Sequence, residues 1–418
     1  MKVVVIGGGL LGLTTAYLLR TRGLEVTVLD RAEGPGLETS FANAGLLTPS
    51  MAQPWNAPGT WRVLLSSLGR SDSPMQLRLK ALPALAGWGT RFLANSGAKA
   101  FERNTHSNLR LAFYSQKLME LLRHETAVEY GRAARGTLSV FRDARALERA
   151  TDAARQLASS GLTFRRLSTD ETVALEPALE PIALELAGGI HFPIDETGDA
   201  YRFCTGLAEH AKGVGVEFHF RTEVTGLAMR GGHISAVVTE RGRFEADQYV
   251  VAAGSYSTPL LATVGLPLPV RPVKGYSITF DNPGNRCPLA IPIGDYALHA
   301  VVTPLPGVIR VAGTAEFAGF DRRPNQARVQ NLVELARRIL PHAPLSLATA
   351  RPWCGLRAMS ADGVPIIGPT PLSNLFVNTG HGHLGWTMTA GSAQLLTDLI
   401  TGRSAGIDPA PYDFHRFG

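Results

Sequence analysis

The sequence predicts an α/β fold in which one sheet-and-helix domain is interrupted by inserted α+β segments. The first observation is the order of an apolar run, a glycine-rich turn, a helical pattern and a second apolar run over residues 2–30. The second is a series of short strand patterns at residues 216–251, and the third is a strand followed by a helical pattern at residues 375–401. Because strands and helices alternate at both ends of the chain, we expect one discontinuous domain that the chain leaves and re-enters.

The opening stretch reads as a βαβ unit whose turn is Gly7-Gly8-Gly9-Leu10-Leu11-Gly12. In a turn of this type, Gly7 permits the tight bend, Gly9 allows the backbone to approach a pyrophosphate, and Gly12 lets the helix pack on the sheet. Asp30 ends the second strand 18 residues after Gly12, where a carboxylate can accept a hydrogen bond from a ribose 2′-hydroxyl. The pattern therefore predicts a Rossmann-like dinucleotide-binding domain, and the alternative is a glycine turn that binds no ligand.

The composition is that of a globular protein. The 418 residues suffice for two domains or one large discontinuous domain, and the formal net charge of +6 is mild for this length. This charge gives no reason to expect nucleic acid as a partner, although it permits contact with an anionic surface. Three widely spaced cysteines, Cys204, Cys287 and Cys354, predict neither a disulfide framework nor a zinc site. A reducing, cytoplasmic location is expected, and no apolar run approaches the ~18 residues of a membrane-spanning helix.

A loop rich in small polar side chains follows the βαβ unit. After Arg31 and a stretch containing proline and glycine, residues 38–45 read ETSFANAG. Hydroxyl and amide groups so close behind a dinucleotide-binding turn can bind a phosphate or a ring system. An ordinary capped loop is the alternative interpretation.

The region at residues 54–135 carries no clear strand pattern and is expected to be helical. Within it, residues 60–110 contain eight basic residues against two acidic ones, together with Trp61, Trp88 and Phe92. Such a segment can lie on an anionic membrane surface, and the alternative is a solvated helical cap over the active site. The helices are predicted at residues 61–68, 77–94 and 108–126.

The middle of the chain predicts a strand-rich region with one well-marked helix. Asp199 is placed to N-cap a helix over residues 200–212. Later strands lead to the turn Ala252-Ala253-Gly254-Ser255, where a glycine avoids a Cβ that would collide with a bound cofactor. Lys274, in the strand pattern PVKGYS, is either a solvent-exposed charge or a cation close to the cofactor.

The last 68 residues contain two long motifs. Residues 355–368 read GLRAMSADGVPIIG, and residues 379–388 read TGHGHLGWTM at the start of a predicted helix. For an isolated Arg357, a surface charge would be the alternative interpretation. His381 and His383 lie in a glycine-rich turn without a third ligand nearby, so we expect hydrogen-bonding roles and no metal site.

Together these motifs resemble those of the small-subunit type of FAD-dependent D-amino acid dehydrogenases, within the D-amino acid oxidase, glycine oxidase and sarcosine oxidase superfamily. The resemblance covers essentially the whole chain, and the C-terminal motif is similar to the family pattern GxRPxTxDGxPxxG, with Ala358 where proline is usual. It implies FAD as the cofactor, and two returns of the chain to the cofactor sheet favour FAD over a nicotinamide. The specific segments are residues 7–12, 38–45, 195–199, 273–277, 355–368 and 380–388. The expected division is an FAD-binding domain at residues 1–50, 188–262 and 352–418, and a substrate domain at residues 51–187 and 263–351.

The resemblance also implies roles for individual residues. The matching arginine of the family binds the carboxylate of the amino acid, so Arg357 is the expected carboxylate anchor. Val224 is expected to contact adenine through its backbone. The other expected cofactor contacts are Gly7, Gly9, Leu10, Leu11, Gly12, Asp30, Arg31, Thr39, Ser40, Asn43, Ala44, Gly45, Ala253, Gly254, Arg357, Gly382, His383, Leu384, Gly385, Trp386 and Thr387. The candidate catalytic and pocket residues are Arg357, Lys274, Tyr276, Tyr201 and His383, and packing is the alternative for Tyr201.

The expected chemistry is oxidation of a D-amino acid by hydride transfer from Cα to flavin N5, with positioning rather than a protein base carrying most of the rate. The imine product would hydrolyse to a 2-oxo acid and ammonia. A helix expected to begin at residues 384–386 would stabilise the reduced, anionic flavin with its N-terminus. FAD is expected to be non-covalent, because Cys354 lies one position off the register of the cysteine that carries FAD in sarcosine oxidases.

Three functions remain open on the sequence. In the leading interpretation, electrons pass to a quinone or other carrier, and the protein lies peripherally on the inner face of the cell membrane. The second is an oxidase that uses oxygen to oxidise glycine, sarcosine or D-amino acids. The third is a non-catalytic FAD-containing subunit of a larger oxidoreductase.

Overall fold

The predicted βαβ unit lies at the centre of a six-stranded sheet in the computed structural model, which describes residues 1–62, 75–346, 348 and 350–417. Strand β1 pairs in parallel with β2 on one side and with β13 on the other. β19 runs antiparallel to β20, and the other pairs of this sheet are parallel, which confirms the predicted α/β fold. In spatial order the strands are β19 (Ile366–Pro369), β20 (Leu375–Thr379), β13 (Gln248–Val251), β1 (Lys2–Ile6), β2 (Glu25–Leu29) and β9 (Glu217–His219).

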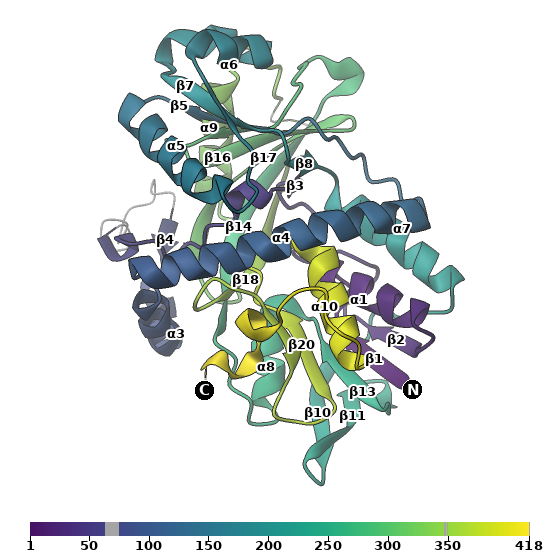
Figure 1. The fold of residues 1–418 in the computed structure, drawn as a ribbon. Coiled ribbons are helices and arrows are strands. Elements are labelled where there is room, and N and C mark those ends of the chain that lie inside the picture. The colour runs from purple at the N-terminus through teal and green to yellow at the C-terminus, as the bar shows by residue number, and fades with distance from the viewer. Residues whose placement is uncertain (63–74, 347, 349, 418) are drawn as a thin grey trace.

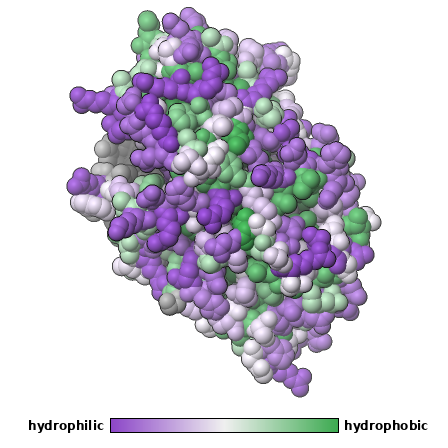
Figure 2. Space-filling model, viewed as in Figure 1, coloured by the Kyte–Doolittle hydropathy of each residue, from purple (hydrophilic) through white to green (hydrophobic). Residues whose placement is uncertain are grey.

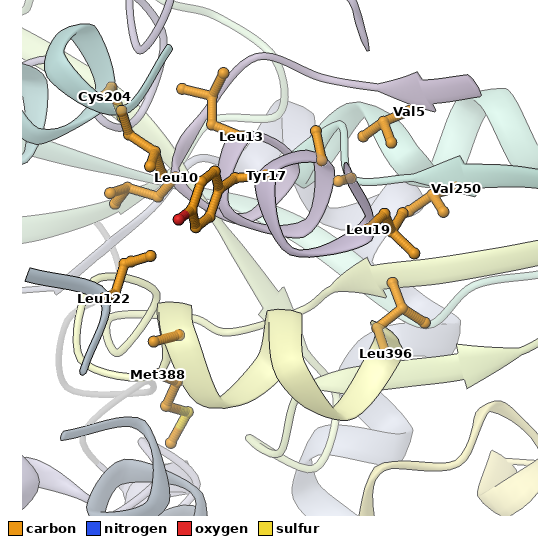
Figure 3. Close-up of a cluster of buried hydrophobic side chains, with 14 of the residues drawn as sticks. Val5, Leu10, Leu13, Tyr17, Leu19, Leu122, Cys204, Val250, Met388 and Leu396 are labelled. Carbon is orange, nitrogen blue, oxygen red and sulfur yellow. The ribbon is translucent and has the colours of Figure 1, made fainter. Parts of the chain in front are cut away.

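One face of this sheet is covered by helices that come from distant parts of the chain (Figure 1). They are α1 (Leu10–Thr21), α4 (Ala98–Thr126), α7 (Ala200–Gly213) and α10 (Thr389–Ile400). Figure 3 shows Leu19 of α1 among Val5 and Val250 of the sheet and Leu396 of α10. Because folding buries these apolar side chains against one another, the first and last segments of the chain stabilise one another.

The opposite face carries a small antiparallel sheet and a short helix. Leu227 and Ile234 of this sheet pack with Val4 and Ile6 of β1 in one buried cluster. The elements are β10 (Val224–Arg230), β11 (His233–Thr239), β12 (Gly242–Phe244) and α8 (Ser257–Ala262). The dinucleotide-binding sheet is therefore buried on both faces, as parallel sheets generally are.

A second, mixed sheet forms the rest of the molecule (Figure 1). In spatial order it contains β18 (Arg351–Ser360), β14 (Val270–Asp281), β17 (Val308–Phe317), β16 (Ala300–Leu305), β15 (Ile293–Asp295), β5 (Thr137–Phe141), β7 (Gly188–Phe192) and β6 (Arg165–Leu167), with β4 (Met75–Leu77) beside β17. Its helices are α3 (Leu82–Ala94), α5 (Ala144–Ala158), α6 (Thr169–Leu175) and α9 (Gln326–Ile339). The pair β3 (Leu46–Leu47) and β8 (Glu196–Thr197) joins the segment after the βαβ unit to this half.

Two strands differ from the expected domain division. Residues 188–192 and 352–360 were expected in the FAD-binding domain, but β7 and β18 belong to the second sheet. The reason is pairing: β18 forms a long antiparallel ladder with β14, and β7 pairs with β5. The division of the chain into two domains stays a prediction.

The helices between residues 61 and 126 also begin at other residues than predicted. The predicted helix at residues 77–94 begins at Leu82, with Pro83 in its first turn, after the short strand β4. The helix predicted at residues 108–126 begins earlier, at Ala98. The helix predicted at residues 61–68 lies largely outside the described residues. Asp199 caps α7 as expected, since its carboxylate accepts hydrogen bonds from the amides of Tyr201 and Arg202.

The face of the molecule in Figure 2, viewed as in Figure 1, is mostly hydrophilic, and hydrophobic residues gather on it only in small groups. Among the described residues, no helix is both long and apolar enough to cross a membrane.

Candidate active site

A cavity of about 1310 Å³ lies between the two sheets. Most of the residues proposed from the sequence line it: Gly7, Gly9, Leu10, Leu11, Asp30, Arg31, Thr39, Ser40, Asn43, Ala44, Val224, Ala253, Gly254, Tyr276, Arg357, Gly382, His383, Gly385 and Trp386. Within the described part of the chain, Gly12, Gly45, Leu384, Thr387, Lys274 and Tyr201 do not reach its wall. Since single small-molecule sites usually measure ~300–1,000 Å³, this volume suits a cofactor together with a second ligand.

The glycine turn is shaped by close backbone contacts. A Cβ on Gly7, whose φ is +118°, would lie 2.5 Å from the carbonyl oxygen of Ala252. A Cβ on Gly12 would overlap the carbonyl oxygen of Gly7, so Gly12 acts by letting α1 approach the strand and not by touching a ligand. The side-chain oxygen of Ser40 accepts a hydrogen bond from the Leu10 amide at 3.2 Å, which fixes the start of α1 at the cavity.

Asp30 and Arg31 hold the far end of the cavity. The two carboxylate oxygens of Asp30 accept hydrogen bonds from the amides of Gly8 at 2.5 Å and Ala32 at 2.7 Å. Burial raises the pKa of Asp30 above its usual value, although these amides oppose the shift. The Arg31 guanidinium donates to Glu38 at 2.7 Å and lies 3.7 Å from the centre of the Tyr256 ring. Both residues shape the loop that would surround a ribose.

The polar segment after the turn supports the strand that carries Arg357. The Thr39 hydroxyl donates to the carbonyl oxygen of Leu356 at 2.9 Å, and the Ser255 hydroxyl donates to the same oxygen at 3.1 Å. The amide oxygen of Asn43 accepts from the Gly45 backbone at 3.0 Å. These side chains therefore form hydrogen bonds within the protein as well as lining the cavity. The two bonds to Leu356 fix the position of β18 one residue before Arg357.

Arg357 is a largely buried cation without a carboxylate partner in the described part of the chain. Its guanidinium lies against the backbone of Gly275, where any side chain would overlap it. Its polar contact is a hydrogen bond of 3.4 Å to the carbonyl oxygen of Thr314, and its centre lies 5.4 Å from the Trp55 ring. Burial lowers the pKa of Arg357 to about 10, so the group stays charged near pH 7. A buried, charged fork facing a cavity is suited to an anionic ligand.

The glycine-rich turn at residues 380–388 brings His383 beside Arg357. The Nε2 atom of His383 lies 3.0 Å from the carbonyl oxygen of Met51, and its ring stacks on Trp55 with centres 5.5 Å apart. Burial lowers the pKa of His383 to about 4, and the nearby charge of Arg357 acts in the same direction. His383 is therefore neutral near pH 7 and donates from Nε2, because a carbonyl oxygen can only accept.

Residues 2–399 match the model of the DAO family, described as FAD dependent oxidoreductase. The chain belongs to this family. It is 43% identical over 418 residues to a D-amino acid dehydrogenase of Paramagnetospirillum magneticum, covering 100% of this chain and 99% of the relative. It is 40% identical to a D-amino acid dehydrogenase of Vibrio vulnificus strain CMCP6, with 100% of both chains covered.

Solved structures share the fold of this chain. Glycine oxidase from Geobacillus kaustophilus aligns with a TM-score of 0.77 at 24% identity, covering 99% of each chain. L-proline dehydrogenase from P. horikoshii aligns with a TM-score of 0.77 at 20% identity, covering 100% of this chain and 97% of the other. At such identities these likenesses show the fold alone.

The cavity fits the FAD of this family. It extends from Val224, beside Asp30, to Trp386 and His381 in the C-terminal turn. The indole nitrogen of Trp386 and Nδ1 of His381 are buried without a hydrogen-bond partner among the described residues. Unpaired buried polar atoms are costly, and polar atoms of a bound cofactor would supply the missing partners. The part of the chain that the structure describes contains no cluster of histidine, cysteine, aspartate and glutamate side chains that could hold a metal ion.

The C-terminal turn corrects one expectation of the sequence. The helix expected to begin at residues 384–386 begins at Thr389, with Met388 as its N-cap. Before it, the carbonyl oxygen of His381 accepts a hydrogen bond from the Leu384 amide at 3.0 Å, and positive φ angles at Gly380 and Gly382 keep the backbone in turns. Trp386 and Gly385 thus line the cavity from a turn, and Leu384 is buried in the core.

Two of the candidate catalytic residues, Lys274 and Tyr201, do not line the cavity. The interpretation of Lys274 as a solvent-exposed charge is wrong, since the residue is 1% exposed. Its Nζ donates to the carbonyl oxygen of Arg323 at 2.5 Å and lies 3.9 Å from Glu316. Tyr276, two residues on, donates its hydroxyl to the same Glu316. Tyr201 packs edge-on against Phe41, with ring centres 4.9 Å apart.

Several residues on the cavity wall were not foreseen from the sequence. The segment from Ser50 to Trp55 begins within the short 3₁₀ helix Pro49–Met51 and lines the cavity together with Arg357 and His383. Asp195 anchors it, because its carboxylate accepts from the Ser50 hydroxyl at 2.5 Å and from the Thr137 hydroxyl at 2.6 Å. In the sequence, a tryptophan between two prolines in QPWNAP indicated a non-helical segment here. The prediction of helices over residues 54–135 did not take it into account.

Proposed function

We propose that this protein is an FAD-dependent D-amino acid dehydrogenase, which oxidises the Cα–N bond of a D-amino acid to an imine. Water then converts the imine to a 2-oxo acid and ammonia. The single observation that carries the proposal is Arg357, a partly buried guanidinium that faces the cavity without a carboxylate partner in the described chain. Relatives at 40–43% identity over their full length, named D-amino acid dehydrogenases, support the same substrate class.

In this proposal Arg357 binds the carboxylate of the substrate. Two parallel N–H···O bonds fix the orientation of the carboxylate as well as its position. A charge-assisted hydrogen bond of this kind contributes about 1.5–3 kcal/mol. Gly275 leaves the space for the guanidinium, and Trp55 covers it from the other side.

His383 and Tyr276 take positioning roles. Since His383 donates from Nε2 to Met51, its Nδ1 carries no proton and can accept a hydrogen bond from the amino group of the substrate. Tyr276 lines the cavity with its hydroxyl held by Glu316, so it fixes the wall and does not move a proton. Burial and the bond to Glu316 raise the pKa of Tyr276, which keeps the hydroxyl protonated. FAD, when bound, accepts the two electrons of the oxidation.

FAD attachment is non-covalent in this proposal. Cys354 is buried, its thiol donates to the carbonyl oxygen of Arg322 at 2.8 Å, and it is not among the described residues that line the cavity. Burial also raises the pKa of Cys354, which disfavours the reactive thiolate. Acid denaturation should release yellow FAD into the supernatant, whereas yellow precipitate would contradict the assignment.

The experiment that tests the proposed function is anaerobic mixing of the purified protein with amino acids. We expect D-alanine to bleach the flavin absorbance and L-alanine to leave it unchanged. Absence of bleaching by every D-amino acid, by glycine and by sarcosine would leave the non-catalytic subunit as the function. Rapid peroxide formation under air would instead assign the oxidase, which uses oxygen as the acceptor.

The electron acceptor in this proposal is a quinone or another membrane carrier, and α3 is the peripheral contact with the inner face of the membrane. Residues 75–101 contain no aspartate or glutamate, and four of them are basic: Arg78, Lys80, Arg91 and Lys99. Leu82 and Leu93 on the outer side of α3 are 39% and 44% exposed. Apolar groups bordered by cations suit an anionic lipid surface.

This contact is testable with vesicles. The protein should sediment with vesicles that contain anionic phospholipid and remain in solution with vesicles of neutral lipid. Leu82→Asp with Leu93→Asp should abolish sedimentation, while Leu184→Asp, at an exposed leucine of the other half, serves as the matched control. Equal binding of all three proteins would favour the solvated helical cap.

A further inference from the structure

The cavity continues beyond the residues assigned above into a part with no role in amino acid binding. We call this part the α5 recess, because the inner face of α5 forms one wall and the strands β5 and β7 form the other. It is lined by Phe141, Ala150, Ala153, Leu157, Ile190 and Phe192. All six side chains are apolar, so the recess is suited to an apolar ligand or to an apolar part of one.

Charged side chains near the α5 recess do not alter this chemistry. Arg149 of α5 is exposed and lies at the rim. Asp295 is buried, but one carboxylate oxygen accepts from Arg142 at 2.9 Å, and the other accepts from the amides of Ala297 and Leu298 at 3.0 and 3.1 Å. Both oxygens of Asp295 are therefore already hydrogen-bonded within the protein. They do not require a polar ligand in the recess.

The α5 recess opens to solvent at one end and joins the active site at the other. At the outer end, Tyr296 is 56% exposed and stacks on Phe141 with ring centres 5.2 Å apart. At the inner end, Thr137 and Ser50 belong to the same cavity wall and share Asp195 as their hydrogen-bond acceptor. The recess is therefore a passage from the surface to the residues around Arg357.

The passage is too long to hold only the side chain of an amino acid. In the order of the second sheet, β18, which carries Arg357, and β5 are five strands apart. At the usual ~4.8 Å between neighbouring strands, this is about 24 Å along the sheet. A single side chain extends only a few bonds from a carboxylate bound at Arg357. A longer molecule is needed to occupy both ends.

We propose that the α5 recess binds the apolar tail of a prenylated quinone whose ring reaches the active site. The inference rests on the proposed function, which leaves two electrons on the enzyme after each amino acid is oxidised. Two electrons and two protons pass to the two carbonyl oxygens of the quinone, which become hydroxyl groups, and the enzyme returns to its oxidised state. After the product leaves, the flat quinone ring enters the same site. The isoprenoid units lie between the small side chains of α5 and the rings of Phe141 and Phe192.

The passage depends on two small side chains of α5. Ala150 and Ala153 leave the space between the helix and the sheet open, so a larger side chain at either position would fill it. By contrast, Ala158 at the end of α5 is exposed and does not line the cavity. Ala153→Phe therefore blocks the recess, and Ala158→Phe is the matched control on the same helix.

The test compares quinones with one ring and different tails, for example a dimethoxy-methyl-benzoquinone without a tail, its form with a single prenyl unit and its form with a tail long enough to span the distance of about 24 Å to the recess. In the wild-type protein, kcat/KM for the quinone should rise by about tenfold or more with the long tail, because apolar surface is buried in the recess. Ala153→Phe should remove this gain, leaving the three quinones equal within about twofold. The tail-less quinone and D-alanine should keep their wild-type kcat/KM, and Ala158→Phe should behave as wild type.

Direct binding separates this inference from the proposed function. Trp55 and Trp353 line the cavity, so quenching of tryptophan fluorescence reports quinone binding without turnover. Affinity should rise with tail length in the wild-type protein and not in Ala153→Phe or in the milder Ala153→Leu. A tail-length gain that persists in both variants would overturn the inference, as would a rise in the KM for D-alanine alone. If D-amino acids fail to bleach the flavin, the proposed function fails whatever the quenching shows.

Discussion

The guanidinium group of Arg357 occupies the space that a side chain on Gly275 would fill. The two residues lie on paired antiparallel strands, where Gly275 faces Gly355 and Val273 faces Arg357. Because any Cβ at position 275 would overlap the guanidinium, Gly275→Ala should displace Arg357 while leaving the dinucleotide half intact. We expect kcat/KM for D-alanine to fall at least about tenfold, the cost of losing one charge-assisted hydrogen bond, with FAD content unchanged.

The control for this change is Gly226→Ala. Gly226 lies in β10 with no atom within 4 Å of its added Cβ and with an ordinary φ angle, so the substitution should keep activity. Equal kcat/KM for Gly275→Ala and the wild-type protein would show that Arg357 does not depend on this space.

Arg357 itself should separate substrate binding from cofactor binding. Arg357→Ala should retain FAD, measured by absorbance, and lose at least about tenfold in kcat/KM, because the substrate carboxylate would lie in the cavity unpaired. Arg357→Lys should recover part of the loss, since an ammonium keeps the charge but not the fork. Turnover of D-alanine at the wild-type rate by Arg357→Ala would exclude the residue from the site.

Gly12 should be required for FAD although it does not line the cavity. Gly12→Val would push α1 away from Gly7, and with it the amides that face the pyrophosphate. The purified variant should lack the yellow colour of FAD. Gly213→Ala, at a helical glycine with open space around its added Cβ, is the matched control and should purify yellow. Stoichiometric FAD in Gly12→Val would contradict the role given to the turn.

The parts of the fold that the sequence predicted best are the local ones. The turn from Gly7 to Gly12 and the N-cap Asp199 depend on residues only a few positions apart, and both are confirmed. The order of β18 beside β14 depends on pairing across 80 residues, which no local pattern reveals. That is why residues 352–360 were expected in the FAD-binding domain, whereas β18 pairs within the second sheet.

The same limit applies to side chains of the active site. Arg357 could be proposed from its motif, but its neighbours Gly275, Trp55 and Thr314 come from three distant segments. Lys274 shares its strand with Gly275, yet successive residues of a strand point to opposite faces, so the side chain of Lys274 points toward Glu316, as the Tyr276 hydroxyl does, and not toward Arg357. The alternation could be read from the sequence, but the sequence did not show which face of the strand Arg357 occupies.

Lys274 should matter for stability and not for catalysis. Lys274→Met leaves the fully buried carboxylate of Glu316 without the nearby ammonium group, and removing one partner of a buried pair typically costs about 3–5 kcal/mol. Arg78, which also binds Glu316, should reduce this cost to the lower end of that range. We expect a lower thermal midpoint with kcat/KM within a few-fold of wild type.

The control for Lys274→Met is Lys99→Met, at an exposed lysine of α4. That variant should unfold at the wild-type temperature. A collapse of kcat/KM in Lys274→Met at a temperature where the protein remains folded would restore Lys274 as a residue of the active site.

His383 should make the protein more sensitive to acid. Burial holds the pKa of His383 at about 4 in the folded state, below the ~6.5 of an exposed histidine. The unfolded chain therefore binds the proton first as the pH falls, and the stability associated with the neutral ring, complete above pH 6.5, is lost between about pH 6.5 and 4. In His383→Gln this loss is absent, so the difference in unfolding free energy between wild type and variant should shrink over that range by at most about 1.4 kcal/mol per pH unit. Denaturant unfolding at several pH values measures it, and a difference that is constant from pH 7 to 4 would show that His383 titrates normally.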